Sequence, residues 1–307
     1  MSEAKDAPGR EASGADDGSQ RLQEKILAEY PRLGLDDQFT FGCHPGVSCF
    51  NCCCSDVNIF LSPYDVLRLR KRLGITSGEF LDRYALMPVQ KDMKTPVVLM
   101  RMKDDAGRTC PLLTEEGCGV YDDRPWPCRM YPLGMAAAKD TPDGWRGERF
   151  WFLLREDTCK GFDEPNSWTV KEWLENQGVE PYDDWGDAYK ELTLHKFFED
   201  GGVLSPEKLN MFFTACYDLD KFRSFVFETT LLERFDVDED FIHEMSYDDE
   251  ALLRFAFLWL RFSLFGEPTM KARPEAIEAV RGRVEQQRAE RMRTSAASDQ
   301  KVKEVAP

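Results

Sequence analysis

The sequence has no long hydrophobic run. No segment reaches the ~18 uncharged apolar residues that a membrane-spanning helix needs, and the nearest, FAFLWL at 255–260, is bracketed by Arg254 and Arg261. The first twenty residues contain no apolar stretch after their charges, so they do not have the pattern of a secretory signal. These absences predict a cytoplasmic protein without a membrane span. In such a reducing compartment lasting disulfides are rare.

Basic residues are also scarce. The chain has 40 Lys and Arg against 56 Asp and Glu, a formal net charge of −16. This balance argues against nucleic acid as a partner, because phosphate binding needs a basic surface. There is neither a G-x-G-x-x-G motif after a strand nor a P-loop, so no nucleotide site is indicated. Acidic residues are too numerous for one pair to stand out as an acid/base couple, so the sequence leaves open whether the protein is an enzyme.

Histidine is rare, with three residues, whereas cysteine is abundant, with ten. Five cysteines fall within the twelve residues 43–54, flanked by Gly, Pro, Ser and Asn. Ordinary buried cysteines, as in a helical core, do not explain this density, although that interpretation suits Cys216 in NMFFTACYDL. A redox disulfide between Cys49 and Cys52 is an alternative, but a thioredoxin-type motif would open a helix after a strand. The cluster therefore predicts thiolate-bound metal.

The remaining cysteines of the middle section are dispersed, at Cys110, Cys118, Cys128 and Cys159. Ligands in distant groups let a metal tie separate loops into one fold, since binding energy becomes folding energy. All-thiolate surroundings favour zinc or iron–sulfur over calcium, magnesium or manganese, which prefer oxygen. Because no second Cys-x-x-Cys pair is present, the pattern favours an iron–sulfur cluster, with Zn²⁺ as the alternative.

Three charged side chains beside these cysteines have two interpretations each. His44, next to Cys43, could be a ligand, although a polar loop histidine with no role is favoured. Arg129 could stabilise the negative charge of the thiolates or could act elsewhere. Arg124 has the same option, but a surface ion pair with Asp122 or Asp123 is favoured.

The fold class predicted is α+β, a cysteine-rich domain with short strands and helices followed by a mainly α-helical region. Capping boxes predict helices that begin after Ser62, Thr76 and Thr169, and Gly74 follows the end of the first. Strand-like segments lie at 57–61, 97–102 and 150–154. The expected organisation is a disordered segment 1–20, a helix and lead-in 21–40, a metal-binding domain 41–165, a helical region 166–293 and a flexible tail 294–307.

The ordered motifs of this section resemble a known family. The series begins with the Cys-x-x-Cys-Cys of residues 49–53 and LSPYDVLRLRKRLGI, continues with CPLL…GCGVYDDRPWPCRMYP, and ends with CKG before an E-W helix. It is similar to the zinc- or iron-chelating cysteine-cluster family (YkgJ-like) over roughly residues 41–178. The spacing of Cys43 and Cys49, and the triple cysteine that ends at Cys54, depart from the usual pattern. The resemblance implies eight candidate metal ligands: Cys43, Cys49, Cys52, Cys53, Cys110, Cys118, Cys128 and Cys159.

Three functions fit these features. The first is a metal-binding protein, with iron–sulfur favoured, in a redox, metal-handling or protein-modifying role. The second is a protein-modifying enzyme, since a relative of this domain occurs in flagellin lysine methylases, with a protein substrate as its partner. The third is an interaction module in which zinc is structural.

Overall fold

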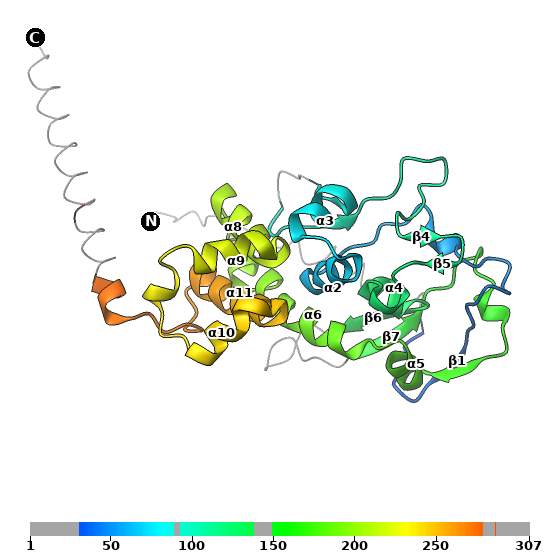
Figure 1. The fold of residues 1–307 in the computed structure, drawn as a ribbon. Coiled ribbons are helices and arrows are strands. Elements are labelled where there is room, and N and C mark those ends of the chain that lie inside the picture. The colour runs from blue at the N-terminus through cyan, green and yellow to red at the C-terminus, as the bar shows by residue number, and fades with distance from the viewer. Residues whose placement is uncertain (1–30, 89–92, 138–148, 279–285, 287–307) are drawn as a thin grey trace, which may run out of the picture. The chain divides into compact units, whose positions relative to one another are not determined.

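The computed structural model describes residues 31–88, 93–137, 149–278 and 286 (Figure 1). The segment expected to be disordered (1–20), the helix expected at 21–30 and the tail at 294–307 lie outside the described residues. Near the end of the expected helical region 166–293, residues 274–278 are described as helical.

The chain forms two compact units, each made of two separate stretches. Unit 1 comprises residues 1–55 and 127–181, and unit 2 comprises residues 56–126 and 182–307. The units therefore interleave along the sequence and do not follow the domain ranges expected above, which remain a prediction about independent folding.

Unit 1 consists of short strands and loops. Its two antiparallel pairs are β1 (Gln38–Thr40) with β8 (Ser167–Thr169), and β6 (Leu133–Ala137) with β7 (Arg149–Leu153). Its helical elements are η1 (Cys52–Cys54), α4 (Trp126–Met130), which starts at the last residue of unit 2, η3 (Gly161–Asp163) and α5 (Val170–Asn176). The strand expected at 150–154 is thus confirmed, shifted by one residue.

Aromatic side chains fill the interior of unit 1. The Phe41 ring meets the Trp173 ring edge to face, with centroids 5.5 Å apart, and Trp173 also meets Phe39 and Trp168. Both indole N–H groups find carbonyl acceptors: Trp168 donates to Phe41 O at 2.9 Å and Trp173 to Met130 O at 3.3 Å. These bonds remove the cost of burying polar atoms in an apolar cluster.

Unit 2 is mainly helical, with two small hairpins. Its first half contains α2 (Pro63–Leu73), α3 (Ser77–Tyr84), β2 (Ala85–Leu86) paired with β3 (Leu99–Met100), β4 (Leu113–Thr114) paired with β5 (Gly117–Cys118), and η2 (Tyr121–Asp123). Its second half contains α6 (Glu180–Thr193), which begins in the last residues of unit 1, α7 (Lys196–Glu199), α8 (Pro206–Tyr217), α9 (Leu219–Phe227), η4 (Leu232–Arg234), α10 (Glu239–Tyr247), α11 (Asp249–Leu260) and a π-helical turn η5 (Arg261–Phe265). These elements confirm the α+β class and the helical C-terminal region.

Local signals set the predicted helix starts. Ser62, Thr76 and Thr169 each accept a hydrogen bond from the third residue of the helix that follows, whose carboxylate bonds back to the capping residue. Gly74 ends α2 in the left-handed conformation, with φ 65°. The strand expected at 57–61 is wrong as a strand: it makes only an isolated bridge from Phe60 to Leu99, so the segment has no continuous pairing partner.

Large apolar side chains fill the core of unit 2. They come from helices far apart in the sequence and are fully buried: Leu67 and Leu69 of α2, Phe80 of α3, Phe212 and Tyr217 of α8, Phe222 of α9 and Phe255 of α11. Cys216 of α8 is also fully buried, which confirms its expected place in the core.

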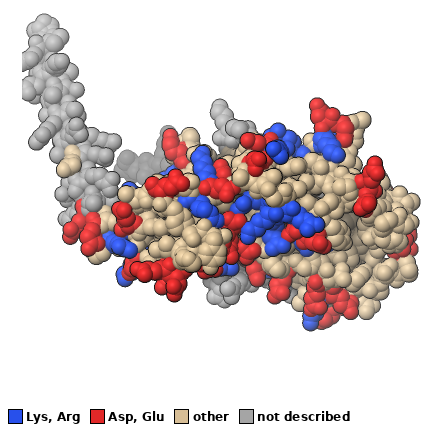
Figure 2. All heavy atoms as spheres, in the orientation of Figure 1, with Lys and Arg blue, Asp and Glu red and all other residues tan. Residues whose placement is uncertain are grey.

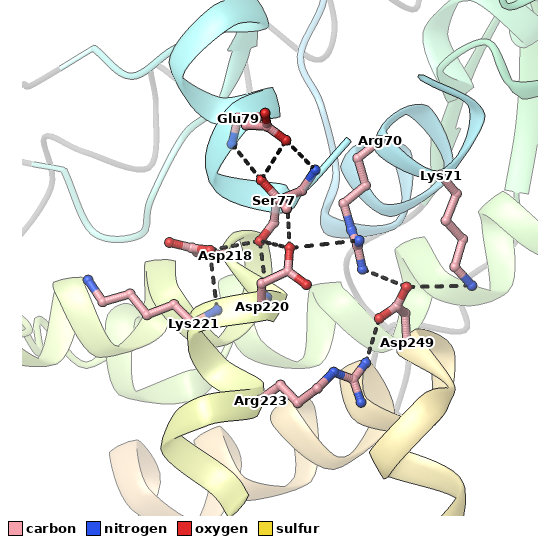
Figure 3. A network of polar contacts seen from close by, with 10 residues as sticks. Arg70, Lys71, Ser77, Glu79, Asp218, Asp220, Lys221, Arg223 and Asp249 are labelled. Atoms are coloured by element: carbon pink, nitrogen blue, oxygen red, sulfur yellow. Dashed lines mark hydrogen bonds and ion pairs between the residues drawn. The ribbon is translucent and has the colours of Figure 1, made fainter. Parts of the chain in front are cut away.

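A polar network links the helix starts inside unit 2 (Figure 3). The Ser77 N–H donates to Asp220 Oδ2 at 2.6 Å, and its hydroxyl lies within hydrogen-bond distance of Asp218 and Asp220. Asp249 lies 2.5 Å from Arg70 Nη2 and 2.6 Å from Arg223 Nη2. The contact between Arg70 and Asp249 is an ion pair without good hydrogen-bond alignment, because Nε and Nη2 of Arg70 have no hydrogen-bond partner among the described residues. The network therefore ties α2 and α3 to α9 and α11 through charge.

On the face drawn in Figure 2, both acidic and basic side chains reach the described surface. None of the described helices combines the length and the apolar character needed to cross a bilayer.

Candidate metal centre

The loop at residues 42–55 of unit 1 packs five thiols into consecutive tight turns. The Cys52 N–H donates to Cys49 O at 2.9 Å, and the Cys54 N–H donates to Asn51 O at 3.0 Å. Asn51 has φ 68°, a left-handed conformation that asparagine tolerates better than most residues. Within this loop Cys43, Cys52 and Cys53 are exposed, and Cys49 and Cys54 are half-buried.

A second loop of unit 1, the Cys-Lys-Gly segment at residues 159–161, lies against the first. The Lys160 N–H donates to Cys49 Sγ at 3.0 Å, and the Gly42 N–H donates to Gly161 O at 2.9 Å. A Cβ on Gly161 would lie 2.6 Å from the Phe41 ring, so glycine is required for this approach. The two predicted ligand loops of unit 1 are therefore in direct contact.

The charges of three other thiols act on Cys43. Although the Cys43 side chain reaches solvent, neighbouring protein atoms partly desolvate its thiol. This desolvation, and then the charges of Cys53, Cys49 and Cys159, raise the pKa of Cys43 to about 11. Gathering several thiolates in one place is thus unfavourable without a compensating charge, which a bound cation supplies.

Cys53 behaves differently. A hydrogen bond from the Cys54 thiol, opposed by burial, lowers the pKa of Cys53 to about 7. Cys54 is absent from the predicted ligands, and the structure gives it a contact with a predicted ligand. The only sequence signal for this contact is that the two cysteines are adjacent.

Tyr131 is a further side chain at this site that the sequence did not single out. Burial is the main cause that raises its pKa, and a hydrogen bond with Cys159 also contributes. Its ring meets the Phe41 ring at 5.8 Å between centroids. Tyr131 therefore connects the Cys159 loop to the aromatic interior of unit 1.

Unit 2 contains a separate pair of predicted ligands on the β4–β5 hairpin. Cys118 pairs with Leu113 across the hairpin, and the Leu113 N–H donates to Cys110 O at 3.2 Å. Burial is the main cause that raises the pKa of Cys110, and the charge of Cys118 raises it further. Hydrogen bonds from the N–H groups of Leu112 and Leu113 act in the opposite direction. The hairpin thus brings Cys110 and Cys118 close enough to affect each other.

Cys128 lies in α4, two residues after Trp126. Two acidic side chains of unit 2 accept hydrogen bonds from Trp126. The Trp126 N–H donates to Asp65 Oδ1 at 2.8 Å, and its indole N–H donates to Asp183 Oδ1 at 2.7 Å. These bonds, together with Pro125 and Pro127, fix where the backbone enters the Cys128 turn.

The two arginines beside Cys128 are both buried. Arg129 Nη1 donates to Gln177 O at 2.7 Å. Arg124 bonds the Tyr121 carbonyl, and its guanidinium lies 3.9 Å from the Tyr121 ring centre. Arg124 is therefore buried and does not lie at the surface, where its pair with Asp122 or Asp123 was expected.

The donor chemistry fits zinc or an iron–sulfur cluster. The predicted ligands are thiols, the soft donors that both groups prefer, and backbone N–H groups point at the sulfurs of Cys49 and Cys110. Hydrogen bonds of this kind stabilise ligating thiolates. In the described part of the chain, however, no three His, Cys, Asp or Glu side chains are already arranged to hold one ion. The ligand assignment therefore remains a prediction.

Comparison with protein families gives a match to part of the chain. Residues 43–163 match the CxxCxxCC family, described as "Putative zinc- or iron-chelating domain". The range includes all eight predicted ligands, and the match confirms the resemblance found in the sequence. It supports metal binding by this segment without deciding between zinc and iron. Comparisons with curated proteins and with solved structures give no match.

Proposed function

We propose that this chain is a metal-binding protein that holds an iron–sulfur cluster through clustered thiolates. The carrying observation is the contact between the two cysteine loops of unit 1. Cys49 accepts a hydrogen bond from Lys160, 111 residues further along the chain and next to Cys159. A thiol that receives a backbone N–H from a second cysteine loop is in the environment of a ligating thiolate.

The proposed ligands fall into two groups. Those of unit 1 are Cys43, Cys49, Cys52, Cys53, Cys128 and Cys159, and those of unit 2 are Cys110 and Cys118. We also propose a cytoplasmic location, because a reducing compartment keeps thiol ligands from forming lasting disulfides.

Two considerations support iron over zinc. The tight first loop with dispersed later cysteines lacks the paired Cys-x-x-Cys knuckles of structural zinc sites. The N–H groups aimed at sulfur are, in addition, a means by which proteins set cluster potentials. When bound, a cluster supplies one-electron transfer, which suits a redox, metal-handling or protein-modifying role.

Metal and acid-labile sulfide analysis after anaerobic purification tests the proposal. We expect a brown protein that contains iron and inorganic sulfide, and loss of both in Cys49→Ser. Cys216→Ser is the matched control, because this buried thiol lies in the helical core and should leave the metal content unchanged. A colourless protein with stoichiometric zinc would mean that the thiolates bind zinc and not an iron–sulfur cluster. A protein that takes up neither metal would contradict the proposal.

A further inference from the structure

A third contact joins the two cysteine loops, next to the hydrogen bonds of Gly42 and Cys49. His44 Nε2 lies 3.1 Å from Glu164 Oε2, although the two residues are 120 positions apart. His44 directly follows Cys43, and Glu164 ends the turn that begins after Cys159. The pair therefore connects the same two loops as the bond from Lys160 to Cys49.

Both ring nitrogens of His44 are engaged. The Gly46 N–H donates to His44 Nδ1 at 3.1 Å, so Nδ1 contributes its lone pair. A neutral imidazole has one donor and one acceptor nitrogen, so the proton is on Nε2, which donates to Glu164. Because the only lone pair of the ring accepts the Gly46 N–H, this arrangement orients the loop and does not present a nitrogen to a metal.

The backbone at Gly42 shows how closely the loops approach. A Cβ on Gly42 would lie 2.8 Å from the Glu164 Cβ and 3.1 Å from Asn166 Oδ1. A side chain at this position would push Glu164 away from His44. Glycine thus permits the contact immediately before the first predicted ligand.

We propose that His44 and Glu164 are positioning residues that clasp the Cys43–Cys54 loop onto the Cys159 loop and slow the loss of bound metal. This inference rests on the proposed metal site. It assigns His44 a specific task, in place of the two roles that the sequence allows, ligand or idle loop residue. His44 and Glu164 have 51% and 27% of their side-chain surface exposed, so the effect of the clasp is modest.

The test measures Co²⁺ dissociation from the loaded full-length protein by transfer to a chelator. We expect His44→Ala and Glu164→Ala each to speed dissociation about two- to fivefold, as the loss of one partly exposed hydrogen bond allows. The double variant should be no faster than either single variant, because each removes the same contact. Glu164→Gln, which keeps an acceptor for Nε2–H, should restore most of the slow dissociation.

The matched control is the exposed pair Lys171–Glu175 on α5 of the same unit, with 4.0 Å between its charged atoms. Glu175→Ala should leave the dissociation rate unchanged. The sulfur-to-cobalt charge-transfer bands should be the same in His44→Ala, Glu164→Ala and the parent protein, since neither variant removes a ligand.

Three results would overturn the inference. If only His44→Ala alters the cobalt spectrum, His44 is a ligand. If the effects of the two single variants simply add, the residues do not act as a pair. Hydrogen exchange in metal-free protein separates this failure from failure of the proposed function. Even if the parent binds no cobalt, Glu164→Ala should speed exchange in residues 42–48, and unchanged exchange there would defeat the clasp by itself.

Discussion

The two units of this protein are stabilised by different means. Unit 2 has a large apolar interior, with fully buried side chains from α2, α3, α8, α9 and α11, and a buried ion network around Asp249. Unit 1 has a small aromatic cluster, and its cysteine loops meet through single hydrogen bonds such as that from Lys160 to Cys49. The comparison teaches that a segment with little apolar burial depends on cross-links, and thiolate-bound metal is the cross-link that we propose for unit 1.

Metal removal should produce the largest difference between the units, measured as loss of hydrogen-exchange protection. We expect hydrogen exchange to rise sharply in the loops at 42–54 and 159–164 and in the β4–β5 hairpin, while α8 and α11 retain their protection. The reason is that only the cysteine loops lose cross-links. The measurement compares loaded, metal-free and reloaded protein. Equal loss of protection in both units would show one cooperative domain and break the comparison.

Removal of a buried charge should instead affect unit 2. Asp249→Ala leaves Arg70, with 9% of its side chain exposed, without its closest partner. We expect the free energy of unfolding to fall by about 3 kcal/mol, as for other broken buried pairs, with metal content retained. Urea denaturation measures the loss. Glu244→Ala, in an exposed pair with Arg254, should cost about 0.5 kcal/mol or less, and an equal cost for both variants would argue against the network.

Cys216→Ser compares a cysteine of the apolar core with the cysteines proposed as metal ligands. Burial raises the pKa of this thiol well above its ordinary value, so it stays neutral. A hydroxyl in its place should cost about 1–3 kcal/mol if it finds no partner. Thermal unfolding gives the cost, and metal analysis should show the parent content. Loss of metal in this variant would mean that thiols of unit 2 other than Cys110 and Cys118 serve the metal.

Acid should weaken the polar network of unit 2 before its apolar core. Burial acts against the Asp220 charge, but hydrogen bonds from Ser77 and the charges of Arg70 and Arg223 outweigh it and lower the pKa of Asp220. A depressed pKa contributes stability above the unfolded value of about 3.9 and loses it as the pH falls further. Asp220 is 42% exposed, so we expect less than about 1 kcal/mol. Denaturation at pH 5 and pH 3 should show a smaller difference for Asp220→Asn than for the parent, and equal differences would count against this explanation.

The smallest effect is expected at Cys54. The family pattern places the ligand at Cys53, and the Cys54 thiol donates to Cys53. Cys54→Ser keeps a donor at this position and should keep near-normal metal content, whereas Cys53→Ser should lose metal. Metal analysis of the two variants decides, and the reverse result would shift the ligand register of the first loop by one residue.

Local signals made part of the fold predictable. The starts of α2, α3 and α5 follow from Ser62, Thr76 and Thr169, because a capping box involves only four consecutive residues. The cysteine spacing likewise predicted the family. The segment at 57–61 shows the limit, since β propensity cannot supply a paired strand.

Contacts between distant residues could not be predicted. Ser77 bonds Asp220 across 143 positions, and His44 meets Glu164 across 120. Nothing in either local sequence specifies its partner, because such pairs depend on how the whole chain returns on itself. The burial of Arg124 was missed for the same reason, since its guanidinium meets the carbonyl and the ring of Tyr121 inside the fold.

The interleaving of the units has a consequence for synthesis on the ribosome. Translation produces α2 and α3 of unit 2 before the second stretch of unit 1, residues 127–181. Only afterwards does it produce α9 and α11, which complete the interior of unit 2. Ser77 precedes Asp220 by 143 residues, which at about 5–20 residues per second corresponds to roughly 7 to 30 seconds. During that interval the apolar side of α2 emerges without the helices that later cover it. The nascent chain therefore passes through a period in which apolar side chains of unit 2 are synthesised but not yet covered.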